Sequence, residues 1–160
     1  MTSIEVLTYV SFGYSFIAGI IPFAESNYLW KKNFFNKCLV AAIISGIVGL
    51  ALEANKPQQL KTGLVAVIMF SPLIYLSYFQ FFRWLFKKWT GTEPYITSSS
   101  SMIGGVPLDM FSSTYTEEKS TKYPKDRKIM LSDFVVSFLQ ALVPIFTILG
   151  LIFLVVKINK

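Results

Sequence analysis

The sequence contains no histidine, one cysteine and few charged residues, and each shortage excludes a class of chemistry. Without histidine, the 160-residue chain has no histidine-ligated haem and no catalytic imidazole, and the single Cys38 leaves neither an intrachain disulfide nor a zinc site of cysteine and histidine. Only 15% of the residues are charged, against about a quarter in ordinary globular domains. Because 53% are hydrophobic, the composition predicts a chain that lies in a lipid bilayer.

The sequence also lacks the short motifs that accompany common enzymatic chemistry. It has no glycine-rich phosphate loop, no GxGxxG, no GxSxG and no HExxH. Its aspartates between residues 83 and 133 have no regular spacing. We therefore expect no enzymatic activity, no catalytic residue, no cofactor and no metal.

Four stretches are long and apolar enough to cross a bilayer as helices. A spanning helix needs about 20 apolar residues, because a hydrocarbon layer of about 30 Å is crossed at about 1.5 Å per residue. None of the stretches shows the alternation of a barrel strand. We predict an all-α membrane protein, a single polytopic domain over residues 1–160 with four transmembrane helices in a bundle. The predicted spans are residues 4–24, 38–54, 63–82 and 134–156.

Two further features accompany these spans. Pro72 and Pro144 lie inside the third and fourth spans, where a missing backbone N–H predicts a kink. Residues 83–133 form one long extramembrane loop, whose start is aromatic and basic as is typical of the headgroup layer.

The basic residues favour one orientation of the chain. Eleven of the 15 fall on one side if both termini lie outside the cytoplasm. Three of these eleven lie between the first two spans and eight after the third: Lys31, Lys32, Lys37, Arg83, Lys87, Lys88, Lys119, Lys122, Lys125, Arg127 and Lys128. This predicts a multi-pass protein of the plasma (bacterial inner) membrane with both termini outside the cytoplasm. The absence of Lys or Arg before Lys31 favours a retained first span over a secretion signal. An odd number of spans, with an interfacial first helix, is the rival interpretation.

Small residues recur every four positions on the first two spans. In lipid, helices associate where small residues let their backbones approach. The candidate packing positions are Ser11, Ser15, Gly19, Ala41, Ser45 and Gly49. They indicate either contacts within one bundle or a face for another subunit, and the sequence leaves both open.

Three polar residues are candidates for a transport pathway, because polar groups within a bilayer are costly unless paired or hydrated. Glu5 lies at the start of the first span, Glu53 at the end of the second, and Gln140 about two turns into the fourth. The alternatives are solvated helix ends and a hydrogen bond between helices.

An apolar island in the long loop is a candidate docking segment for a partner protein. It is flanked by glycine and proline residues and is too small to bury a core of its own. Its residues are Met102, Ile103, Val106, Leu108, Met110 and Phe111.

These patterns lead to one preferred function and two alternatives. We expect a non-enzymatic accessory or scaffolding subunit of a larger integral-membrane complex, which docks through helix faces and the 83–133 loop. Its partners would be other membrane subunits and lipid, including anionic lipid, and not nucleic acid. The alternatives are a small oligomeric channel or transporter and, with less support, a membrane immunity or regulatory protein.

Overall fold

A computed structural model describes residues 3–24, 29, 31–55, 62–91, 102–103, 106–107 and 131–159. Most of them belong to four α-helices: α1 (Ser3–Ala24), α2 (Lys32–Ala54), α3 (Leu64–Thr90) and α4 (Leu131–Ile158). All four are long and apolar enough to cross a membrane. This confirms the predicted helical class and the four candidate spans.

Two helices extend beyond their predicted spans by six or more residues. The second was predicted from residue 38 but begins at Lys32, and the third was predicted to residue 82 but continues to Thr90. Both extensions contain lysines, which lower the hydropathy without breaking a helix, since lysine is a good helix former. At the end of α3, Gly91 takes a left-handed conformation with φ 71°, and its N–H donates to the Lys87 carbonyl at 3.0 Å.

The three prolines within helices interrupt none of them. Pro72 lies in α3, Pro144 in α4, and Pro22 near the end of α1. All three are buried. The kinks predicted at Pro72 and Pro144 stay predictions.

Between α3 and α4, the structure describes one short strand pair. Strand β1 (Met102–Ile103) runs antiparallel to β2 (Val106–Pro107), with Met102 opposite Pro107. This pair lies within the segment predicted as the extramembrane loop.

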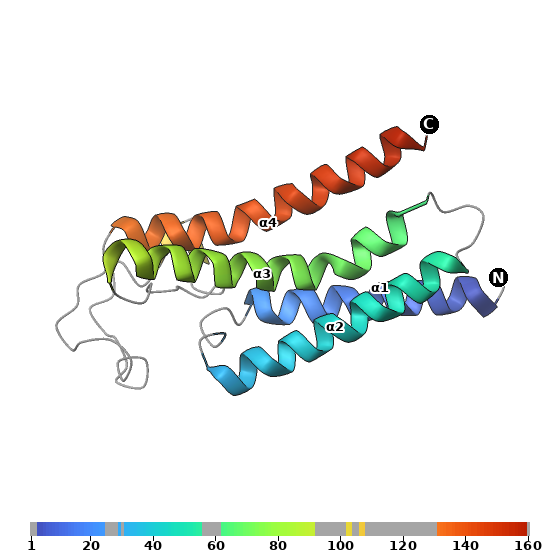
Figure 1. Cartoon of the computed structure of the whole chain (residues 1–160), viewed down its shortest axis with the longest axis horizontal. Coiled ribbons are helices and arrows are strands. Elements are labelled where there is room, and N and C mark those ends of the chain that lie inside the picture. Colours follow the sequence, from blue (N-terminus) through green and yellow to red (C-terminus); the bar gives the residue numbers. More distant parts are fainter. Residues whose placement is uncertain are drawn as a thin grey trace.

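Helix α3 is the centre of the arrangement (Figure 1). It packs extensively against α1, α2 and α4, and α1 also packs against α2, whereas α4 makes extensive contact with α3 alone. The N-terminal end of α1 and the C-terminal end of α4 lie at the same end of the bundle (Figure 1). There the Asn159 side-chain amide donates to the Thr62 carbonyl at 3.1 Å and ties α4 to the start of α3.

The distribution of polar side chains is the reverse of that in a water-soluble bundle. The side chains buried between the helices include many polar ones, whereas large apolar side chains face outward on α1, α2 and α4. In water this arrangement would expose apolar surface without compensation, but in lipid it is the favourable one, because polar groups find partners only inside. The buried polar residues are Thr8, Ser11, Ser15, Ser45, Asp133, Ser137 and Gln140.

Candidate functional site

The contact of α1 with α3 is built around a backbone carbonyl that proline leaves without its helical partner. Pro72 has no N–H, so it cannot donate to the carbonyl of Ile68 four residues earlier. Two hydroxyls donate to that oxygen instead: Ser71 at 2.7 Å from within α3, and Ser15 at 2.9 Å from α1. The proline therefore creates an acceptor that joins the two helices.

Helix α2 contacts α3 through a serine hydroxyl that donates to an α3 carbonyl, and through glycines that allow the two helices to approach closely. The Ser45 hydroxyl donates to the Met69 carbonyl at 2.7 Å. At Gly49 the helices are so close that a Cβ would collide with the Cβ of Met69, and at Gly46 a Cβ would lie 3.1 Å from the ring of Phe70. At Gly49, only glycine allows this separation.

All six predicted packing positions take part in contacts within the chain or lie beside them. Besides Ser15, Ser45 and Gly49, the Ala41 carbonyl accepts the Tyr14 hydroxyl at 3.2 Å, which links α1 to α2. A Cβ on Gly19 would lie 3.8 Å from Pro72, and Ser11 is buried. These positions therefore lie at or beside contacts within this bundle, and a face for another subunit stays a prediction.

The three candidate pathway residues are not brought together. Glu53 binds the start of α3, where its carboxylate accepts the N–H of Gly63 at 2.7 Å and that of Ala66 at 3.3 Å. Gln140 instead meets Tyr75, which lies twelve residues after Gly63 and therefore about 18 Å further along the bundle. Glu5 lies in the first turn of α1.

Gln140 is the most unusual of these residues. It is only 2% exposed, and its side chain hydrogen-bonds that of Tyr75 on α3. Its Oε1 atom is buried and has no hydrogen-bond partner within the described part of the chain. An acceptor left in this state costs about 1–3 kcal/mol, so Gln140 marks a place where a donor would bind favourably.

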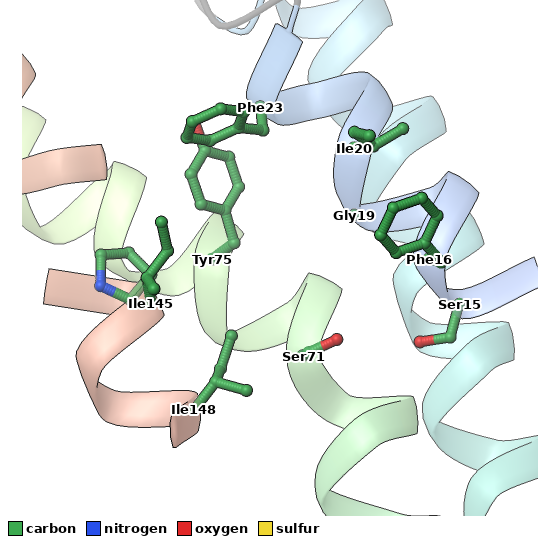
Figure 2. A pocket seen from close by; sticks show the side chains of 10 residues that line it. Ser15, Phe16, Gly19, Ile20, Phe23, Ser71, Tyr75, Ile145 and Ile148 are labelled. Carbon is green, nitrogen blue, oxygen red and sulfur yellow. The ribbon is translucent and has the colours of Figure 1, made fainter. Parts of the chain in front are cut away.

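A groove that the sequence did not predict runs between α1 and α4, with α3 as its floor (Figure 2). It exists because α1 and α4 both pack on α3 but make no extensive contact with each other. Its volume is about 250 Å³ and its walls are mostly apolar. Ser15 and Ser71 point toward one another on the side of α1 (Figure 2). Such a groove depends on which helices pack against one another. The hydropathy of the sequence does not show which helices are neighbours.

The apolar island of the loop is described only in part. Met102, Ile103 and Val106 belong to the short strand pair. Leu108, Met110 and Phe111 lie outside the described residues. The docking role of the island stays a prediction.

The site that emerges is a polar helix interface beside an open lateral groove, in a chain with four candidate membrane spans. Among the described residues, no three acidic or cysteine side chains come close enough to hold a metal ion. No known family model matches the sequence, and comparisons with curated proteins and with solved structures found no similar protein.

Proposed function

We propose that this protein is a non-enzymatic accessory or scaffolding subunit of a larger integral-membrane complex. The observation that carries the proposal is Gly150, an exposed glycine in the middle of α4, around which no atom lies within 4 Å of an added Cβ. Within a helix, glycine is about 1 kcal/mol less favourable than alanine. At Gly46 and Gly49 packing against α3 explains this cost, but at Gly150 nothing within the described residues does.

A partner helix lying against α4 would explain Gly150. Small residues allow helices in lipid to approach closely, and the neighbouring large side chains then interlock. Phe146 and Phe153 lie four residues before and three after Gly150, hence on the same face, and are 66% and 70% exposed. Since α4 packs extensively only on α3, most of its circumference is available to a partner subunit.

The arrangement of charges supports the proposed orientation in the membrane. Lysines at the start of α2 and basic residues at the end of α3 lie at the end of the bundle opposite the two termini (Figure 1). With the positive-inside rule as support, we propose that this end lies in the cytoplasm and the termini outside, in a plasma or bacterial inner membrane. Anionic headgroups would be attracted there. The ammonium of Lys88 over Trp84, 5.2 Å from the ring centre, is typical of this layer.

Co-purification tests the role as a subunit. The tagged chain, extracted in a mild detergent, should recover other membrane proteins in stoichiometric amounts by mass spectrometry. Gly150→Leu should reduce that recovery about tenfold, since a close helix contact is worth about 1–2 kcal/mol. Gly150→Ala, which keeps a small residue at this position, is the matched control. A lone monomer in the extract, or equal recovery with both variants, would contradict the proposal.

Labelling with a membrane-impermeant thiol reagent tests the orientation. In a Cys38→Ser background, a cysteine replacing Asn159 at the end of α4 should react in intact cells, whereas one replacing Lys32 should react only after the cells are opened. The opposite labelling pattern would contradict the proposed orientation and would mean that the termini lie in the cytoplasm.

A further inference from the structure

The buried polar side chains form a series that runs from one end of the bundle to the other. On α1, Thr8, Ser11 and Ser15 are buried at spacings of three and four residues. On α4, Asp133, Ser137 and Gln140 are buried at spacings of four and three. Residues with this spacing are neighbours on a helix surface, with about 5–6 Å between their Cβ atoms.

Helix α3 joins the two halves of the series. The hydroxyls of Ser15 and Ser71 donate to one carbonyl, that of Ile68, at 2.9 and 2.7 Å. Tyr75 follows one helical turn after Ser71, and its side chain is hydrogen-bonded to that of Gln140. Ser15, Ser71 and Tyr75 all line the groove of Figure 2. The series thus passes from α1 through α3 to α4.

The dimensions of the series match those of a membrane. The length of the series along the bundle is the sum of three helical segments, each with a rise of about 1.5 Å per residue. The segments are Glu5 to Ser15 on α1, Ser71 to Tyr75 on α3 and Gln140 to Asp133 on α4. Together they give about 30 Å, which equals the thickness of the hydrocarbon layer. The direction is the same throughout, since α1 runs parallel to α3, and α4, which the series follows backwards from Gln140 to Asp133, runs antiparallel to it (Figure 1). A carboxylic acid stands at each end, Glu5 near the termini and Asp133 near the opposite end.

Gln140 indicates that water belongs in the series. Its Oε1 is buried without a partner among the described residues, although an amide oxygen in lipid needs a donor. A water molecule supplies two donors and, as a bridge, spans groups about 5–6 Å apart. Neighbours in the series on α1 and on α4 lie three or four residues apart, and their Cβ atoms are separated by about this distance.

We propose that this series conducts protons across the membrane, with water bridging its gaps. A proton enters at one terminal carboxylate, and each hydroxyl or water then accepts a proton from one neighbour and passes its own O–H proton to the next. Gln140, an amide, relays no proton itself, and its Oε1 holds the water that carries the proton between the hydroxyls of Tyr75 and Ser137. The other carboxylate releases a proton to the far side, so only O–H bonds break and form. The hydroxyls afterwards turn back to their original hydrogen bonds, such as those to Ile68. This activity goes beyond the role as a subunit and does not depend on it.

The experiment is a proton-flux measurement on the purified full-length chain in liposomes that contain a trapped pH-sensitive dye. A potassium gradient with valinomycin supplies the driving voltage, and protein-free liposomes give the background. Gln140→Leu and Ser15→Ala each remove one link and should lower the flux above background about tenfold, because the water or hydroxyl at that step loses its partner.

Ser45→Ala is the matched control. Ser45 is buried and donates to an α3 carbonyl as Ser15 does, but it lies on α2, away from the series. Its variant should conduct like the unaltered protein, and protection of Cys38 from a thiol reagent shows that each variant is folded. Flux no greater than that of protein-free liposomes overturns the proposal. So does an equal loss in Ser45→Ala and Ser15→Ala, because packing alone would then explain both.

Discussion

The approach of α2 to α3 at Gly49 makes the stability of the bundle sensitive to one methyl group. In Gly49→Ala, the new Cβ would meet the Cβ of Met69, a buried atom fixed to the α3 backbone, and would lie 3.1 Å from its Cγ. Rotating the Met69 side chain does not move its Cβ, so the two helices have to separate. Overpacking of this kind costs about 1–3 kcal/mol. For a chain of this length, the melting temperature should fall by about 3–10 °C.

The single cysteine provides the assay for Gly49→Ala. Cys38 lies in α2 and is 7% exposed, so a fluorogenic thiol reagent should react with it only when the bundle opens. The reaction is followed against temperature in detergent. Gly150→Ala is the control: a Cβ there meets no atom within 4 Å, and its better helix propensity should leave the melting temperature unchanged or slightly higher. An unchanged melting temperature for Gly49→Ala would refute the reasoning.

Three other substitutions test single contacts with the same thermal assay. Glu53→Gln removes the negative charge that accepts the Gly63 and Ala66 N–H groups, and should cost about 0.5–1 kcal/mol; a gain in stability would contradict the capping role. Gly63→Ala places a Cβ on a residue with φ 87° and should cost about 1–2 kcal/mol, whereas no loss would mean that this conformation is not needed. Tyr78→Phe removes the hydroxyl that accepts the Thr147 hydroxyl at 3.1 Å and should cost about 0.6 kcal/mol; a loss several times larger would show a role beyond this bond.

The helical spans could be predicted because their signal is local. A run such as residues 134–156, without a charge, has no stable alternative in lipid to a helix, and α4 covers all of it. The residues at which the helices begin and end were less predictable. Hydropathy reports where an apolar run ends, whereas α2 and α3 continue through lysines beyond their apolar runs.

The candidate site could be predicted from the sequence only where the type and spacing of the residues alone indicate a helix contact. The spacing of Ser15, Ser45 and Gly49 predicted close helix contact, and each lies at one. Glu53 was instead interpreted as a solvated helix end or a pathway residue, because its partners, Gly63 and Ala66, lie at the start of the next helix. The pairing of Gln140 with Tyr75 depends on which helices adjoin, and a single sequence does not encode this in any local pattern.

The shared acceptor at Ile68 has a consequence for the biosynthesis of the chain. The first helix leaves the ribosome before the third, so during that interval the Ile68 carbonyl to which Ser15 donates has not yet been made. Until then the hydroxyls of the first helix can bond only to their own backbone or to water. The first helix therefore completes this contact only after the third has been made, and a nascent chain stopped after α2 should be a substrate for quality-control proteases.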